Sequence, residues 1–254
     1  MTISVFADAG TPVLHLAGGP CLSLGGRRYE VPEGSKRLLV FVALRTGRIE
    51  RRCAAGTLWP TGDDARAAGN LRSALWRLRT LPVELIHADK WTLCMSGAVT
   101  VDLSVINAWA ARLIQRTEEP ADLVIAPWWG DALDLLPGWY DDWLLMERER
   151  LRQRMLHAIE AVSERLRASS RCAEAVEAAL TAVGVEPLRE SAQRALIEAH
   201  LAEGNWVEAR RSYETYRALL RSELGAEPAA DLIRRLPVPR RRARIGRRRS
   251  PVPQ

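Results

Sequence analysis

The chain has 254 residues, of which 47% are hydrophobic and 27% charged, enough for one large or two ordinary domains with packed cores. It has no apolar run of about 18 residues, and residues 1–10 lack the basic and apolar regions of a secretory signal. The four cysteines and four histidines show no Cys-x-x-Cys pair and no metal-ligand spacing. We therefore expect a cytoplasmic protein with reduced thiols, no membrane contact, and no metal or other cofactor.

The net charge of +6 is distributed unevenly along the chain. Residues 1–100 hold 13 Lys and Arg against 8 Asp and Glu, a net charge of +5. Residues 101–239 hold 17 against 23, a net charge of −6, and residues 240–254 hold 7 arginines and no acid. A basic first part, an acidic middle and a basic tail predict separate tasks for the three parts.

The first elements are short. Glycines interrupt brief apolar segments over residues 11–31, which predicts two or three antiparallel strands. Ser35 is expected to cap a helix over 36–45, and a second short helix is expected over 51–58. Together they place a small β part and two helices before the most informative segment of the chain.

That segment is a predicted amphipathic helix over residues 63–80, with Asp63 or Asp64 as its cap. Its apolar face repeats at helical spacing through Ala67, Leu71, Ala74, Leu75 and Leu78. Its opposite face carries Arg66, Arg72, Ser73, Trp76 and Arg77. A β-hairpin is expected over 83–94, with its turn at 88–90. Strands, three helices and a hairpin predict a winged helix with an extra N-terminal β-sheet, whose third helix enters a DNA major groove.

The candidate DNA contacts divide by their expected roles. Arginine reads guanine through two parallel hydrogen bonds, so we expect Arg66, Arg72 and Ser73 to meet base edges. The remaining helix candidates, expected to hold the DNA backbone, are Trp76, Arg77 and Arg79. Four further cations are either phosphate contacts or merely exposed: Lys36, Arg37, Arg51 and Arg52. Lys90, in the hairpin turn, is expected near a phosphate or in the adjoining minor groove. A solvated basic face is the alternative for the whole set.

The second part of the chain is predicted to be almost wholly helical. Helices are expected over 101–116 and 139–168, with a last helix over 228–236. Shifting the sequence by 34 residues places Cys172-Ala173-Glu174-Ala175 on Trp206-Val207-Glu208-Ala209. Because 34 residues is the period of the tetratricopeptide helix pair, we expect a tetratricopeptide-like α-helical bundle with a concave groove.

Several motifs resemble the Streptomyces antibiotic regulatory protein (SARP) family. In the first part they are Gly34-Ser35-Lys36-Arg37-Leu38-Leu39, Leu58-Trp59-Pro60 and the segment Asn70–Arg79. In the second part they are Val101-Asp102-Leu103, Leu144–Leu151, Glu186-Pro187-Leu188-Arg189-Glu190, Glu208–Tyr213 and Glu223–Pro228. No P-loop motif is present, so the resemblance is to the short form of the family. Two departures stand out: the segment 117–130 differs from the family's helix pair, and the wing turn has Asp89-Lys90 where the family often has glycines.

The resemblance implies a mainly α protein with a small β part. It implies a winged-helix DNA-binding domain over 1–97 and a bacterial transcriptional activation domain over 98–236. Residues 237–254, rich in arginine and proline, are expected to be disordered and to add salt-dependent phosphate contact.

The expected function is that of a transcription activator in the cytoplasm, on the bacterial nucleoid, rather than an enzyme. The resemblance implies binding to repeated half-sites in promoter DNA, recruitment of RNA polymerase or a sigma factor, a homodimer on DNA, and target genes of antibiotic biosynthesis. The alternative is a helical-repeat adaptor whose basic N-terminal domain binds protein or RNA.

Overall fold

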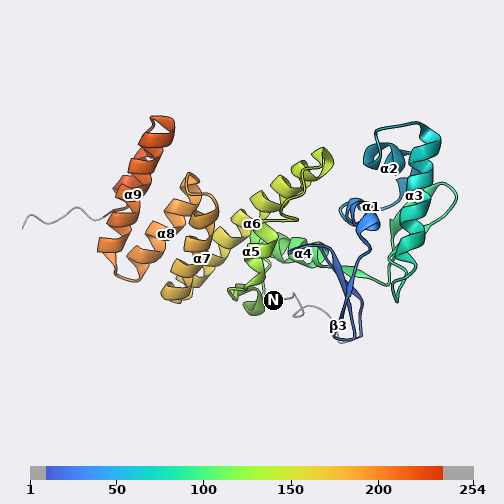
Figure 1. Ribbon diagram of the computed structural model, residues 1–254. Helices are drawn as coiled ribbons and strands as arrows, with labels where there is room; N and C mark the ends of the chain where they lie inside the picture. The colour runs from blue at the N-terminus through green and yellow to red at the C-terminus, as the bar shows by residue number, and fades with distance from the viewer. Residues whose placement is uncertain (1–9, 237–254) are drawn as a thin grey trace, which may run out of the picture.

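The structure is a computed structural model that describes residues 10–236. A small β part and three helices form one end of the molecule, and a row of helices forms the other end (Figure 1). The predicted mainly α fold with a small N-terminal β part is therefore confirmed. The predicted disordered tail, residues 237–254, lies outside the described residues.

The N-terminal sheet has four strands in the order β3-β2-β1-β7. The strands are β1 (Val13–His15), β2 (Cys21–Leu24), β3 (Arg27–Glu30) and β7 (Thr100–Val101). The first three are antiparallel neighbours, as the glycine-interrupted segments predicted. Strand β7 pairs in parallel with β1, which brings Thr100 opposite Val13. The sheet thus holds the start of the second part of the chain against the first strand.

Three helices and a three-stranded sheet of order β4-β6-β5 follow the first three strands. The elements are α1 (Glu33–Ala43), β4 (Ile49–Glu50), α2 (Arg51–Leu58), α3 (Asp64–Leu78), β5 (Ile86–Ala88) and β6 (Thr92–Met95). Helix α3 packs on α1 and α2, and β6 packs on α1. These elements follow the order that the sequence predicted, with the hairpin turn at residues 89–91 rather than 88–90.

One predicted cap is wrong. Helix α1 begins at Glu33, directly after Pro32, so Ser35 lies within the helix and does not cap it. Its side chain is fully buried, and its hydroxyl donates a 2.8 Å hydrogen bond to the carbonyl of Ala74 in α3. A buried hydroxyl needs such a partner, and here the partner comes from a neighbouring helix rather than from the first turn of α1.

The second part is a stack of helices. Its elements are α4 (Asp102–Gln115), the 3-10 helix η2 (Pro120–Leu123), α5 (Trp128–Leu133), α6 (Asp142–Ala168), α7 (Cys172–Val185), α8 (Glu190–Ala202), α9 (Trp206–Leu224) and α10 (Ala230–Arg234). Helices α6 to α9 each pack on the next helix in the chain (Figure 1). Helices α6 and α8 end at Ala168 and Ala202, and α7 and α9 begin at Cys172 and Trp206. Both pairs of boundaries keep the 34-residue spacing read from the sequence.

Helices η2 and α5 lie in a stretch for which the sequence predicted no helix. They are stabilised by tryptophan packing: Trp109 of α4 meets Trp128 edge-on with centroids 5.1 Å apart, and Trp129 at 5.6 Å. The indole nitrogen of Trp109 donates a 3.0 Å hydrogen bond to the carbonyl of Asp122. Such short helices gain little from their own sequences and form because large aromatic surfaces are buried between them.

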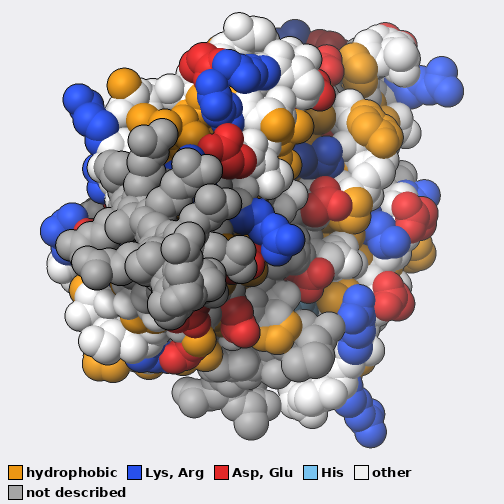
Figure 2. Space-filling view, turned by 90° about the vertical axis from the view of Figure 1, so that its left-hand side faces the viewer, with side chains coloured by type: hydrophobic (Ala, Val, Ile, Leu, Met, Phe, Trp, Pro, Cys, Tyr) orange, Lys and Arg blue, Asp and Glu red, His pale blue; other side chains and the backbone are white. Residues whose placement is uncertain are grey.

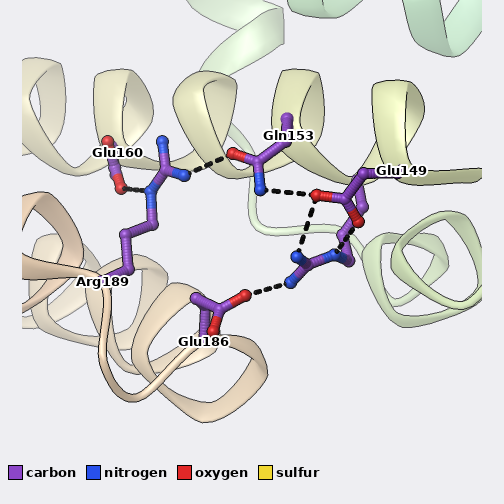
Figure 3. A network of polar contacts seen from close by, with 6 residues as sticks. Glu149, Gln153, Glu160, Glu186 and Arg189 are labelled. Atoms are coloured by element: carbon purple, nitrogen blue, oxygen red, sulfur yellow. Dashed lines mark hydrogen bonds and ion pairs between the residues drawn. The ribbon is translucent and has the colours of Figure 1, made fainter. Parts of the chain in front are cut away.

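The segment between α7 and α8 fastens the stack to α6 (Figure 3). Glu186 pairs with Arg152, whose guanidinium also binds Glu149 at 2.9 Å. Arg189 donates to Glu160 and to Gln153, both at 2.6 Å. Glu186 and Arg189 thus hold a connecting segment against α6, a helix 27 residues long.

A buried carboxyl group joins the N-terminal sheet to α4. Asp102 is the first residue of α4, and its Oδ2 accepts hydrogen bonds from the amides of Leu16 (2.9 Å) and Ala17 (3.0 Å). Its Oδ1 has no hydrogen-bond partner among the described residues. Burial, with a smaller contribution from the charge of Asp131, raises the pKa of Asp102 to about 7. The junction between the two parts therefore favours the protonated acid.

We expect Asp102→Asn to increase the free energy of unfolding relative to the wild type, and to do so more at pH 8 than at pH 4. A folded-state pKa above the unfolded value stabilises the fold below pH 4, and this contribution is lost as the pH rises through 7. The free energy of unfolding should increase by at most about 4 kcal/mol. The pKa rises from 3.8 to about 7, and each pKa unit corresponds to about 1.36 kcal/mol. Urea unfolding of both proteins at pH 4, 6 and 8 measures the difference. A difference that is constant over this range contradicts the assignment.

Candidate nucleic-acid interface

Helix α3 is positioned by its cap and by its apolar face. The carboxylate of Asp63 accepts a 2.7 Å hydrogen bond from the amide of Arg66, as the sequence predicted for this cap. The buried residues of α3 are Ala67, Leu71, Ala74 and Leu78. Because these four lie on one side of the helix, its rotation is fixed and its other side faces outward.

The outward side holds the predicted recognition residues. All are exposed: Arg66, Arg72, Ser73, Trp76, Arg77 and, at the C-cap, Arg79. Trp76 has 68% of its surface exposed, which is unusual for so large an apolar side chain. Gly69 lies beside the Nη2 atom of Arg72, which would be 3.7 Å from a Cβ at that position. The outward face of α3 therefore carries several arginines, and the small residue Gly69 lies beside one of them, Arg72.

The arginines of this face differ from most others in having no ion pair. Among the described residues, no carboxylate lies within 4.0 Å of the guanidinium groups of Arg66, Arg72, Arg77 and Arg79. In the helical stack most arginines are paired, for example Arg165 with Glu118 at 2.5 Å. Figure 2 shows the end of the molecule that carries the last helices, where cationic and anionic side chains lie interspersed. The uncompensated positive charge of α3 is what an anionic ligand would meet.

The hairpin turn is held by the Asp89 carboxylate. It accepts hydrogen bonds from the amides of Trp91 and Thr92, both at 2.7 Å, and from the Thr92 hydroxyl at 3.0 Å. The amides of Thr92 and Trp91 are the main reason why the pKa of Asp89 falls to about 2. Arg48 pairs with the same carboxylate, and Arg51 donates to the Asp89 carbonyl at 3.2 Å. Hydrogen bonds to Asp89 thus order this turn, whereas a glycine turn is ordered by its backbone geometry.

Lys90 and Trp91 extend from this turn into solvent. The Lys90 ammonium group lies 4.8 Å from the centre of the Trp91 ring, within cation–π distance, and 70% of the Trp91 surface is exposed. The sequence pattern predicted Lys90 in the turn, but it placed Trp91 in the following strand and indicated no role for it. A tryptophan beside a lysine at the end of a polar turn is the signal that would have identified it.

Two cavities lie between α3 and the hairpin. One, of about 590 Å³, is lined by Trp76, Arg79 and the start of the hairpin. The other, of about 680 Å³, is lined by Arg52, Lys90 and Trp91. Arg51 and Arg72 line both cavities. The structure therefore brings Arg51, Arg52, Arg72 and Lys90 together around one concave surface.

Three other predicted contacts are engaged within the protein. Arg37 donates to the Leu58 carbonyl at 3.0 Å and pairs with Asp141 at the start of α6, so it connects the two parts of the chain. Lys36 pairs with Glu33 at 2.6 Å, and Arg52 pairs with Asp64 at 2.8 Å. Lys36 and Arg52 have exposed partners, whereas the Asp141 side chain is mostly buried. Of the three, Arg37 is the least available to a ligand.

The comparisons with known proteins agree with this architecture. Residues 104–236 match the profile of the bacterial transcriptional activator domain family. This match covers more than half of the chain, so the protein belongs to that family and is a transcription regulator of the SARP type.

Two individual relatives extend the likeness to the first part of the chain. The chain is 29% identical over 236 residues to the regulatory protein AfsR of Streptomyces griseus, covering 87% of this chain but only 23% of that relative. Its fold is similar to that of EmbR of Mycobacterium tuberculosis, solved in complex with a low-affinity phosphopeptide. That likeness has a TM-score of 0.67 at 18% identity and covers 90% of this chain and 66% of EmbR.

None of the helices within residues 10–236 has the length and apolar character needed to cross a membrane. The same residues contain no group of three or more His, Cys, Asp or Glu side chains placed to hold a metal ion.

We expect Asp89→Ala to loosen the hairpin turn, because the amides of Trp91 and Thr92 lose their acceptor. Hydrogen exchange at these two amides should become faster, while the amides within α6 should not change. The wild-type turn should loosen in the same way as the pH falls from 4 toward 2, since a lowered pKa stabilises the fold only above its unfolded value. Asp134→Ala, at an exposed aspartate after α5, is the control. Unchanged exchange at Trp91 and Thr92 contradicts the role of Asp89.

Proposed function

We propose that the protein is a sequence-specific DNA-binding activator of transcription, with residues 1–97 as its DNA-binding domain. The observation that carries the proposal is the outward face of α3, on which arginines without ion pairs surround a short side chain and an exposed tryptophan. A helix of this kind fits the DNA major groove, whose floor offers acceptors to arginine. The hairpin beside it is placed to contact the adjoining backbone or minor groove.

We assign the proposed DNA contacts of α3 to bases or to phosphates by the direction in which each side chain extends. Arg77 lies over the start of α1, since its Nη1 atom would be 2.9 Å from a Cβ at Gly34. This position on the flank of the helix suits a phosphate contact. Arg72 lies on the hairpin side, beside Gly69, where the helix is thin enough to approach the base edges closely. Arg66 and Ser73 complete the proposed base-reading set, and Trp76 and Arg79 the backbone set.

The helical stack, residues 98–236, is proposed to carry activation. We infer that it contacts RNA polymerase or a sigma factor, and that two copies bind repeated half-sites in a promoter, with genes of antibiotic biosynthesis as targets. Membership in a family of transcriptional activator domains supports this assignment of the stack. In this proposal the protein acts in the cytoplasm, on the nucleoid, and residues 237–254 add salt-dependent contact with phosphates.

Fluorescence anisotropy tests this division between base contacts and backbone contacts. Binding is measured on duplexes from the DNA upstream of the gene and on random duplexes. We expect Arg72→Ala to reduce discrimination at one or two base pairs by about 1–3 kcal/mol. We expect Arg77→Ala to weaken binding to every duplex and to reduce the slope of affinity against salt by about one.

Arg211→Ala is the matched control, because Arg211 is an exposed arginine of α9, remote from α3 along the chain. It should change neither the discrimination nor the salt slope. Equal wild-type affinity for upstream and random DNA contradicts sequence-specific binding. Affinity for RNA but not for DNA would instead support the adaptor function.

A further inference from the structure

A second concave site lies on the other side of the N-terminal unit, where it meets the helical stack. It is an open cleft of about 1020 Å³, at the upper end of the 300–1,000 Å³ range of small-molecule sites. One wall is formed by residues 43–47, which end and follow α1, and by the end of β6. The other wall is formed by α4 and α6. The cleft shares no lining residue with the two cavities beside α3.

Apolar side chains form part of the cleft lining, beside polar and charged ones. The apolar side chains include Leu44 and Met95 from the N-terminal unit, and Leu103, Leu135 and Met146 from the second part. Met146 has 63% of its surface exposed and lies on α6 beside the exposed residues Glu149 and Arg150. Methionine adapts its shape to different apolar partners, so a flexible thioether at the opening suits a ligand with an apolar body.

Two arginines of the cleft are held in place by neutral groups. In α6, Arg154 donates to the amide oxygen of Asn107 at 3.0 Å. After α1, Arg45 lies 3.5 Å from the centre of the Phe41 ring and donates to the Phe41 carbonyl at 3.2 Å. Within residues 10–236 neither guanidinium has a carboxylate at ion-pair distance. Each arginine is thus oriented but keeps its full positive charge.

The acids of the cleft are, in contrast, already neutralised. Glu147 pairs with Arg150 at 3.0 Å, and Glu149 pairs with Arg152 at 2.9 Å. Glu149 and Gln153 also belong to the network that fastens α6 to the segment before α8 (Figure 3). The α6 wall is therefore fastened to the neighbouring segment. Neither acid lies at ion-pair distance from Arg45 or Arg154, although the charge of Glu147 acts on Arg45 from farther away. A preformed wall reduces the entropy lost when a ligand binds.

We propose that this cleft binds a small organic anion with an apolar body and one carboxylate or sulfonate group. The apolar body would lie on Met95, Leu103 and Met146, and the anionic group would bind Arg154, with Arg45 on the opposite wall. An anion supplies what both arginines lack, a charged acceptor. The bound molecule would touch both parts of the chain and would therefore hold the N-terminal unit against the stack.

The test uses two fluorescent probes with similar aromatic bodies. One is 8-anilinonaphthalene-1-sulfonate, which has one negative charge, and the other is the neutral N-phenyl-1-naphthylamine. Titration of the full-length protein should show one saturable site for the sulfonate and weaker binding of the neutral probe. Arg154→Ala should lower the affinity for the sulfonate by about tenfold, the equivalent of one charge-assisted hydrogen bond, and leave the neutral probe unaffected.

Met146→Glu should lower the affinity for both probes, because it places a charge at the apolar opening. Its matched control is Leu180→Glu, at an exposed apolar residue of α7, and the control for Arg154→Ala is Arg234→Ala, at an exposed arginine of α10. Both controls should bind the probes as the wild type does. Thermal unfolding verifies that each variant is folded. The proposal is overturned if the cleft variants bind the sulfonate as the wild type does, if the controls weaken it equally, or if the neutral probe binds as tightly.

Discussion

The burial of one face of α3 is the constraint on which the rest of the N-terminal unit depends. Leu71, Ala74 and Leu78 are packed against α1 and α2, so the helix has one orientation and its arginines have one direction. Burying a leucine side chain contributes about 1.5–3 kcal/mol, whereas an exposed arginine costs almost nothing to leave in water. Apolar packing therefore determines where the charge lies, although none of the packed residues is itself charged.

Charge pairing then distinguishes the two ends of the molecule. Both ends are rich in arginine, but in the stack most arginines stand beside glutamates at helical spacing or across helix contacts, as Arg189 does with Glu160. On α3 they stand beside alanine, glycine, serine and tryptophan. Exposed ion pairs contribute little to stability, so the pairing in the stack mainly removes net charge. The contrast leaves Arg66, Arg72 and Arg77 of α3 without ion pairs within residues 10–236, where most other arginines are paired.

Helix α3, its cap and its two faces were predictable from the sequence, because periodicity and a capping aspartate are local signals. So was the stack, because its helix ends repeat every 34 residues. The role of Ser35 was not predictable, since a serine near a helix start has the same local pattern whether it caps or donates to another helix. Helices η2 and α5 were missed because Trp109, from another helix, stabilises them.

Contacts distant in sequence limited the prediction of the site as well. Exposure of Arg66 and Arg72 followed from periodicity, but their lack of partners depends on how every acid of the chain is placed. Arg37 was expected to be a phosphate contact or merely exposed, yet it pairs with Asp141, which is 104 residues away. Asp89 was recognised as a turn residue. Its contacts with Arg48 and Arg51 were not predictable, because they arise only when β4 pairs with β6 and the start of α2 lies beside the hairpin.

The hydrogen bond from Ser35 to the Ala74 carbonyl has a mechanical meaning. Apolar packing resists the separation of two helices but tolerates small sliding along their axes, because it is non-directional. A buried hydrogen bond of 2.8 Å is directional and does not tolerate such sliding. It resists sliding of α3 along α1. Because β6 of the hairpin also packs on α1, α3 and the hairpin are both positioned by the same helix. A ligand that contacted both elements would meet a spacing that α1 sets within the protein.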